Sequence, residues 1–280
     1  MPSVRRTTVW ALAAIAAIGL LAMVAGPFVV RGAFRYYAVQ KALSKIPYAE
    51  ERLAVFPKTR TFTASTPVQP VNLGYATFDM GTNGPIYIAA DGGRGMVVIT
   101  NTDFGFRLTA PYAIDGLTNI AIAADASGSS HLASFVEMEA TDMVAAQVEM
   151  EKTRILPIFQ IALMSKDDFS LYTFKLISKA ALTWGNKETW SFMTPHIKGI
   201  AREGMGPDDR EHVWVNFASL DGTRNLAMEV FLLHGSHKDV VPALDPILAS
   251  FQFTIDKIYD RDEITRLILQ AGIPMRPTKH

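Results

Sequence analysis

The longest apolar segment of the chain lies near its N-terminus. Thr7–Val30 is a run of 24 residues without a charged side chain, dominated by Ala, Leu, Ile and Val. As a helix it would be about 36 Å long, which exceeds the roughly 30 Å hydrocarbon core of a bilayer. A cleaved signal peptide usually has a shorter apolar region that ends in small residues, and here Pro27 follows the best small pair, Val24 and Gly26. We therefore expect residues 1–30 to form an N-terminal tail and an uncleaved, single-pass transmembrane anchor.

Charges beside this run bear on its orientation. Arg5 and Arg6 precede the run and four basic residues follow it, so the positive-inside rule taken literally would keep the large domain in the cytoplasm. However, long domains translocate largely regardless of charge, and a short tail before a single span more often stays inside. We favour an extracytoplasmic domain on a cell membrane of the bacterial envelope type.

Residues 31–46 predict a helix that ends at Pro47 and has two different faces. At 100° per residue its basic side chains fall within an arc of about 120°, and Val39, Leu43 and Ile46 fall on another face. One interpretation is an amphipathic helix on the membrane, where each positive charge contributes about 1 kcal/mol against anionic headgroups. The other is a continued helix with ordinary flanking charges. The candidate membrane-interface residues are Arg31, Arg35, Lys41 and Lys45.

The pattern then changes from a linker to short strands. Residues 47–73 contain four prolines with many Thr and Ser, which is typical of a linker, here with a strand near Arg60–Ala64. From Gly74 onward, apolar runs alternate with turn residues, and Asp91–Gly95 predicts a hairpin turn. We expect an antiparallel meander whose strands cover residues 75–80, 86–90, 96–100 and 104–109.

The middle of the chain favours helices. Ser127–Ser130 can cap a helix over residues 132–151, and residues 155–164 fit either a second helix or a buried strand. Ser165 lies three residues before Asp168, which is a capping pattern for a helix that continues to about Trp184.

The last third predicts strands followed by helices. Strands are expected at residues 196–202, 212–219 and 225–234, the last two joined by a turn at Asp221-Gly222. A helix to about Phe251 and a terminal helix capped by Asp260 and Glu263 follow, and Gly272 ends the second. The order of elements indicates an α+β fold, in which residues 74–280 form a two-layer domain with an antiparallel sheet and packed helices.

Two short motifs carry a resemblance to a known fold. Ala249-Ser250-Phe251-x-Phe253, taken with Gly105-Phe106-x-Leu108-x-Ala110-Pro111, is similar to segments of PsbP/Mog1-type domains. The similarity covers about a dozen residues, and the long helical middle departs from that pattern. It implies an α+β sandwich that serves as an accessory factor, and no functional residue is carried over from it.

Composition excludes several classes of function. Lys+Arg and Asp+Glu are 27 each, so the neutral chain has no overall field to attract nucleic acid, and we expect no nucleic-acid partner. Cysteine is absent, which removes disulfides, thiolate metal sites and cysteine nucleophiles. Hydrophobic residues are 49 % and charged residues 19 %, a balance typical of a folded protein.

One cluster of residues suggests metal chemistry. His234 and His237 can meet on one helical turn, which makes them the candidate metal ligands, and a third ligand could be Asp239, His212 or Glu229. The alternative interpretation is structural: His234 closes a strand and Ser236 caps the next helix. The pair is not accompanied by an HExxH-type base or a second ligand pair.

Other polar motifs are better explained by structure than by catalysis. Ser129-Ser130-His131 is not followed by the second glycine of a nucleophile elbow, and we interpret it as a turn and helix cap. Asp167-Asp168 and Asp208–Glu211 are adjacent acids of the kind that are usually solvated. The catalytic residues are unknown and no cofactor is expected.

These observations together favour a membrane-anchored accessory, binding or assembly factor. Its expected partners are the lipid bilayer through residues 7–30, anionic lipid headgroups, and another protein of the envelope. The alternative is a membrane-tethered hydrolase or metal-dependent enzyme that uses His234 and His237.

Overall fold

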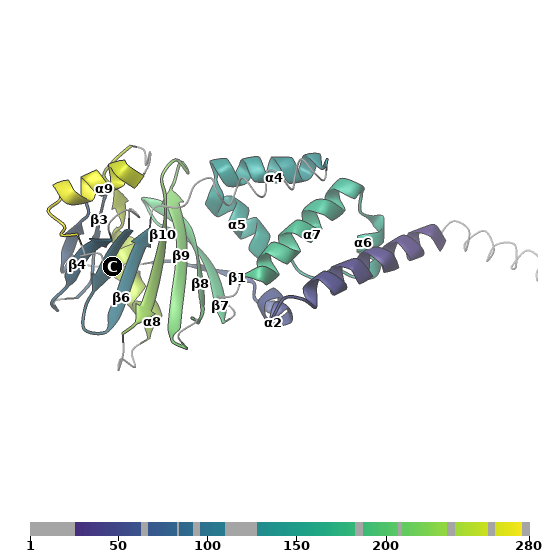
Figure 1. Cartoon of the computed structure of the whole chain (residues 1–280), viewed down its shortest axis with the longest axis horizontal. Helices are drawn as coiled ribbons and strands as arrows, with labels where there is room; N and C mark the ends of the chain where they lie inside the picture. Colours follow the sequence, from purple (N-terminus) through teal and green to yellow (C-terminus); the bar gives the residue numbers. More distant parts are fainter. Residues whose placement is uncertain are drawn as a thin grey trace, which may run out of the picture.

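The chain folds into a mixed α+β structure with two parts (Figure 1). The computed structural model describes residues 26–62, 67–82, 84–91, 96–109, 128–182, 187–206, 209–233, 239–256 and 261–275. One part, which we call the body, contains an eight-stranded sheet, a three-stranded sheet and the helices α8 (Val240–Ser250) and α9 (Arg261–Gln270). The other part, the arm, consists of helices that extend from one side of the large sheet (Figure 1).

The large sheet has the order β1-β7-β8-β9-β10-β6-β5-β4. Its neighbours are antiparallel except β1, which runs parallel to β7. The predicted meander is confirmed for β4, β5 and β6, and so is the hairpin of β9 and β10, where Gly222 has a φ of 77°. The strands are β1 (Pro57–Arg60), β4 (Tyr87–Asp91), β5 (Met96–Thr100), β6 (Phe104–Thr109), β7 (Glu188–Met193), β8 (Ile197–Met205), β9 (Glu211–Ser219) and β10 (Asn225–Leu232).

The strand expected at residues 75–80 belongs to a different sheet from the one predicted. As β3 (Ala76–Asp79) it pairs with β2 (Pro70–Asn72) and β11 (Gln252–Phe253) instead of joining the meander. The carboxylate of Asp79 explains this pairing, because its Oδ2 accepts hydrogen bonds from the backbone N–H groups of Val68 and Gln69 at 2.7 and 2.8 Å. A buried carboxylate satisfied in this way fixes the segment before β2 against β3.

The core of the body lies between the two sheets. Phe251, directly after α8, contacts Phe78 of the small sheet and Phe217 of the large sheet, with ring centroids 5.7 and 4.7 Å apart. All three rings are buried, as are Leu244 and Leu248 of α8. The inner face of the large sheet is thus covered by the small sheet and α8.

The arm is built from α2 (Ala49–Ala54), α4 (Ser130–Thr141), α5 (Met143–Glu151), α6 (Ile158–Leu163), α7 (Lys166–Ala181) and a helix over residues 26–43, which we call the N-terminal helix. The predicted caps at Ser129 and Ser165 are confirmed, since each side chain accepts a backbone N–H three residues later. The single helix expected over 132–151 is instead two helices. Asp142 leaves helical geometry (φ −143°, ψ 78°), and its side chain caps α5 by accepting from Ala145 N.

Residues 47–73 are not simply a linker where the structure describes them. They form α2, β1 and β2, and β1 is an edge strand of the large sheet. Pro57 and Pro70 begin β1 and β2, and a proline is tolerated as the first residue of a strand, so a proline-rich segment does not exclude strands.

The α+β class is confirmed, while the predicted transmembrane helix receives no support from the described residues. None of the helices in that part of the chain has both the length and the apolar character needed to cross a bilayer. Residues 7–25 of the predicted anchor lie outside the described residues.

Candidate functional site

Polar and aromatic side chains gather on the face of the large sheet opposite its inner face, which we call the outer face. In one cross-strand row Arg107 of β6 lies opposite Glu229 of β10, which lies opposite Trp214 of β9. In a neighbouring row Phe231 of β10 lies opposite His212 of β9. Side chains two positions apart on a strand share a face, so all five lie on the same side of the sheet. We call them the outer-face cluster.

Glu229 connects the basic members of this cluster. Its Oε1 lies 2.9 Å from Nδ1 of His212, and Arg107 Nη1 donates to its Oε2 at 2.6 Å. The imidazole is stacked against two aromatic rings, 5.2 Å from the Trp214 centroid and 5.7 Å from that of Phe231. His212 is only 5 % exposed, whereas the Arg107 side chain is 44 % exposed. The cluster therefore combines a buried imidazole with an accessible guanidinium.

The charge of Glu229 follows from these contacts. Burial by itself raises the pKa of Glu229, but the hydrogen bond with His212 and the positive charge of Arg107 outweigh it, and the pKa lies below its ordinary value. The carboxylate is therefore ionised at neutral pH, and it orients the imidazole as carboxylates do for metal-binding and general-base histidines. Acid–base or metal chemistry here would need a further ligand or substrate group beside His212.

The predicted metal site is only partly within the described residues. His234 and His237 lie outside them. Of the three proposed additional ligands, His212 and Glu229 are brought together, while Asp239 caps α8 by accepting from Val241 N at 3.0 Å. Within the described ranges, no group of three or more His, Asp or Glu side chains is arranged to hold a metal ion. The metal centre stays a prediction.

The four predicted membrane-interface residues differ in their surroundings. Arg31 and Arg35 donate hydrogen bonds to the backbone oxygen of Met164, at 3.2 and 2.8 Å, and Arg35 also donates to Ile161 O at 3.2 Å. They thus pair with carbonyls at the C-terminal end of α6, which lack partners within the helix. Lys41 and Lys45 are exposed.

The apolar face of the N-terminal helix is covered by protein. Val39 and Leu43 are buried in a small core with Ile161 of α6 and with Tyr172 and Leu176 of α7. An amphipathic helix that lay on the membrane would instead turn this face toward lipid. Val39 and Leu43 therefore face protein and not lipid, and contact of the basic side chains with headgroups stays a prediction.

A group of buried charges that the sequence did not reveal joins the arm to the body. We call it the buried joint, and it consists of Arg52 of α2, Glu151 of α5, Lys179 of α7 and Arg202 of β8. Glu151 Oε1 accepts hydrogen bonds from Arg52 Nη2 and, at 2.7 Å, from Arg202 Nε. Lys179 Nζ donates to three backbone carbonyls, those of Val55, Glu151 and Thr153, at 2.7, 2.7 and 3.1 Å.

The buried joint carries more positive than negative charge. It contains three basic side chains and one carboxylate, that of the fully buried Glu151, and only Arg52 and Arg202 bond to this carboxylate. Burial lowers the pKa of Arg52. Burial also lowers the pKa of Lys179, to about 8, and the positive charge of Arg52 contributes to this decrease. Sequence periodicity does not identify such residues, because buried charges interrupt the apolar pattern that marks a core. The one signal in the sequence is that Arg202 lies within the strand expected at residues 196–202.

Two serine motifs that the sequence presented separately lie side by side in the arm. Ser130 Oγ donates to Asp167 Oδ2 at 2.9 Å, and Asp168 contacts both Ser165 Oγ, at 2.7 Å, and His131 Nδ1, at 2.9 Å. In a catalytic triad the imidazole stands between the serine and the carboxylate. Here the carboxylate stands in the middle, so the serine is not activated and the arrangement acts as a helix cap.

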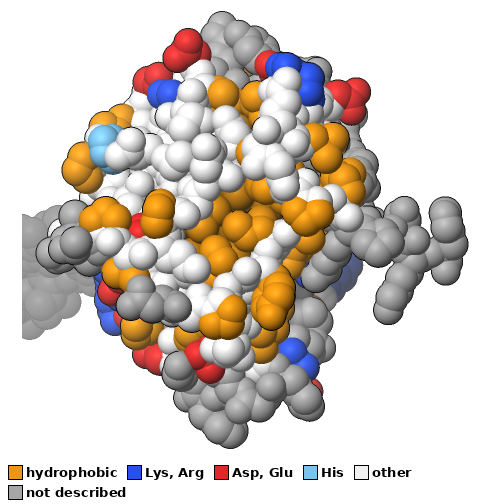
Figure 2. All heavy atoms as spheres, turned by 90° about the vertical axis from the view of Figure 1, so that its left-hand side faces the viewer, with side chains coloured by type: hydrophobic (Ala, Val, Ile, Leu, Met, Phe, Trp, Pro, Cys, Tyr) orange, Lys and Arg blue, Asp and Glu red, His pale blue; other side chains and the backbone are white. Residues whose placement is uncertain are grey.

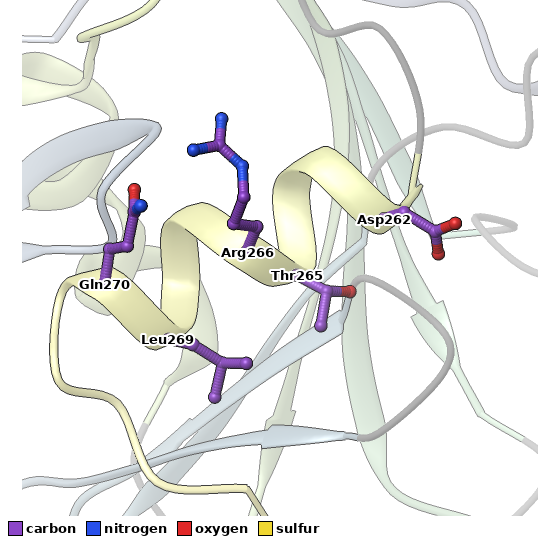
Figure 3. A pocket seen from close by; sticks show the side chains of 5 residues that line it. All are labelled: Asp262, Thr265, Arg266, Leu269 and Gln270. Carbon is purple, nitrogen blue, oxygen red and sulfur yellow. The ribbon is translucent and has the colours of Figure 1, made fainter.

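The end of the body farthest from the arm is apolar. Figure 2 shows hydrophobic side chains around a hollow in the middle of this face, with charged side chains near its edge. A shallow depression of about 430 Å³ lies on α9. Figure 3 shows that Arg266 and Gln270 leave α9 on one side while Thr265 and Leu269 leave it on another, so these polar groups do not converge. This end offers a surface for apolar contact.

No family model, curated protein or solved structure matches the chain. The resemblance to PsbP/Mog1-type domains therefore stays a prediction.

Proposed function

We propose that the protein is a membrane-anchored accessory or binding factor that holds its α+β body in front of the bilayer, on the extracytoplasmic side. The observation that carries this proposal is the surface of the first described turns of the N-terminal helix. Phe28, Val29 and Val30 are exposed and are the last residues of the uncharged run that begins at Thr7, and Phe34, one helical turn after Val30, is 73 % exposed. A contiguous apolar surface of this kind marks contact with a membrane or a protein, and an adjoining uncharged run favours the membrane.

A binding role is supported by the composition of the outer-face cluster. Trp214, Phe231 and Arg107 are aromatic and arginine side chains, the types that contribute most to protein–protein interfaces. Trp214 and Phe231 are partly exposed, and their positions on strands hold them rigidly. The outer-face cluster is therefore the surface we assign to an envelope protein partner.

The alternative function is a membrane-tethered hydrolase or metal-dependent enzyme. It is favoured by one observation, the contact between Glu229 and His212, because a carboxylate-oriented histidine is a common element of such sites. Alanine at both His234 and His237 tests it. Loss of bound Zn²⁺ with the fold intact would favour the enzyme, and unchanged metal content and partner binding would remove it.

Anchoring is tested on membranes isolated from cells that express the full chain. The membranes are extracted with alkaline carbonate, which releases proteins that do not span the bilayer. We expect the protein to remain in the membrane pellet with its N-terminus uncleaved. The matched variant carries Ile18→Arg and Leu21→Arg, since each arginine near the middle of a span costs about 2.5–3.5 kcal/mol, and it should be released into the supernatant. Recovery of the unmodified chain in the supernatant, or a mature start after Gly26, would contradict the anchor.

Orientation is tested separately with a compartment-sensitive reporter fused to His280. We expect activity only outside the cytoplasm. A reporter active only in the cytoplasm would reverse the proposed orientation and leave the anchor itself unaffected.

A further inference from the structure

α6 exposes most of its apolar side chains although it belongs to a folded arm. Its sequence is Ile-Phe-Gln-Ile-Ala-Leu, and Ile161 and Ala162 pack inward. Phe159 is 63 % exposed and Leu163 71 %, and Ile158 beside them is also exposed. Removing such side chains from water is favourable by about 1.5–3 kcal/mol each when burial is complete. This surface is therefore expected to have an apolar partner.

The position of α6 along the N-terminal helix indicates what that partner is. The two helices touch at Gly32, where a Cβ atom would lie 2.7 Å from Ala162 Cβ and 3.1 Å from Ile158 O. Gly32 is two residues after Val30, the last residue of the uncharged run, which is about 3 Å along a helix. If the run occupies the hydrocarbon core, α6 therefore lies where the helix leaves it. Figure 1 shows α6 beside this helix, at the end of the arm away from the sheet.

Arg31 and Arg35 hold α6 at this level. Their hydrogen bonds to Met164 O and Ile161 O connect the N-terminal helix to the end of α6. These bonds also satisfy carbonyls that would otherwise be costly to place near lipid. The guanidinium groups lie just past the uncharged run, at the depth where arginine side chains commonly reach the headgroups.

An open apolar groove lies beside the same turns. It has a volume of about 840 Å³ and runs between the N-terminal helix and Phe169 of α7. Pro27, Val30 and Phe34 line it, and the Arg35 guanidinium lies 4.5 Å from the centre of the Phe169 ring. Hydrocarbon walls with guanidinium groups at the edge match a lipid, whose chains are apolar and whose phosphate is anionic.

We propose that α6 is a second membrane contact, with Ile158, Phe159 and Leu163 immersed in the interfacial region of the bilayer beside the anchor. This inference rests on the proposed function, because the level of α6 is set by the anchor. Its consequence is that the arm does not swing freely on a single span. Two contacts fix its orientation, and the buried joint transmits that orientation to the body.

The absence of cysteine from the chain allows a direct test. Phe159→Cys and Leu163→Cys each introduce one thiol into the full-length protein, which is labelled with an environment-sensitive fluorophore and reconstituted into vesicles of phosphatidylcholine and phosphatidylglycerol. Tyr87→Cys is the matched control, because Tyr87 is an exposed aromatic residue on β4 of the body. Quenching is measured with lipids that carry a doxyl group near the headgroup, and with iodide in the water.

We expect the label at positions 159 and 163 to emit at shorter wavelength than at position 87. Doxyl lipids should quench it several-fold more strongly than the control, and iodide several-fold less. If the vesicles carry the protein but iodide quenches all three labels alike, the inference is wrong while the anchor stands. A label shielded from both quenchers would show that protein covers α6, which also overturns the inference. Protein that does not float with the vesicles contradicts the anchor and, with it, the inference.

Discussion

The buried joint and the outer-face cluster lie on the same face of the same sheet, yet their charges are used differently. Arg107, Glu229, Trp214 and Arg202 form one continuous cross-strand row over β6, β10, β9 and β8. At one end Arg202 is buried beneath α5 and bonded to Glu151, and at the other Arg107 is exposed to water. Two arginines three strands apart in the same row thus differ in their exposure to water.

The difference shows that the covering helix, and not the sheet, decides what a charge does. α5 contributes Gln147, whose Oε1 accepts hydrogen bonds from Arg202 Nη2 and Asn216 Nδ2 at 3.2 and 2.9 Å. Charges that are buried in this way interact strongly with one another, and here they hold the arm against the body. Where α5 does not cover the sheet, a similar ion pair is weaker and remains available to a partner.

The largest expected effect is the loss of the carboxylate in the buried joint. Glu151→Ala leaves Arg52 and Arg202 buried without their shared anion, which typically costs 3–5 kcal/mol. We expect the free energy of unfolding, measured with urea on the full chain in detergent, to fall by about this amount.

Glu149→Ala is the control for this change, because Glu149 lies on the same helix and pairs with Lys152 at the surface. It should cost no more than about 1 kcal/mol. Equal effects of the two substitutions would show that the buried joint does not fasten the arm to the body.

The pH dependence of the free energy of unfolding tests whether the buried joint excludes water. Burial lowers the pKa of Lys179 to about 8, whereas a lysine of the unfolded chain has a pKa of about 10.4. Between these values the unfolded chain binds more protons, so the contribution of Lys179 to stability rises with pH across this window. Lys179→Met should remove this rise, which has a limiting slope of about 1.4 kcal/mol per pH unit.

The measurement compares urea unfolding of wild type and variant from pH 7 to 10.5. Lys152→Met, on an exposed lysine of the arm, should leave the slope unchanged. A constant difference between wild type and Lys179→Met across the range would mean that Lys179 is solvated, and that the buried joint is open to water.

The smallest of the three effects is expected in the outer-face cluster. Glu229→Gln keeps the shape of the side chain but removes the charge that binds Arg107 and His212, and should cost about 1–3 kcal/mol at pH 7. Since the folded-state pKa of Glu229 lies below its ordinary value, its contribution is complete above that ordinary value and is lost as the pH falls through the folded pKa. The difference in the free energy of unfolding between Glu229→Gln and wild type should therefore vanish in acid.

Glu188→Gln provides the comparison for this substitution, because Glu188 forms an exposed pair with Lys58 on the same sheet. Thermal unfolding of both variants at pH 7 and at pH 3 distinguishes the two pairs. If Glu229→Gln lowers the stability to thermal unfolding by the same amount at pH 3 as at pH 7, the cluster is held by packing of its rings and not by the charge of Glu229.

Local sequence patterns predict the structure where neighbouring residues determine it. The turn at Asp221-Gly222, the caps at Ser129 and Ser165 and the three strands of the meander follow from residues a few positions apart, and all are present. The strand at β7 was missed, and the helix over 132–151 was not divided at Asp142. In these cases a local signal competes with contacts that are distant in the sequence.

The candidate site depended on distant contacts to a greater degree. The sequence indicates His212 and Glu229 only as additional metal ligands, whereas the pairing of β9 with β10 places them in contact. The sequence predicts Arg31 and Arg35 beside lipid headgroups but does not indicate that they also bind carbonyls more than 120 residues away in the sequence. A side chain's type and spacing predict its chemistry, but its partner is set by the packing of elements.

The sequence by itself determined the α+β class, the local caps and hairpins, and the uncharged run on which the proposed anchor rests, because each depends on composition or on short-range periodicity. Only the tertiary structure decided which charged side chains are buried and which are exposed to solvent. That choice is made where α5 crosses the outer face, where the arm meets the body, and where α6 touches the N-terminal helix. Burial changes the energy of a charge by several kcal/mol, and burial is a property of the folded chain that no local pattern contains.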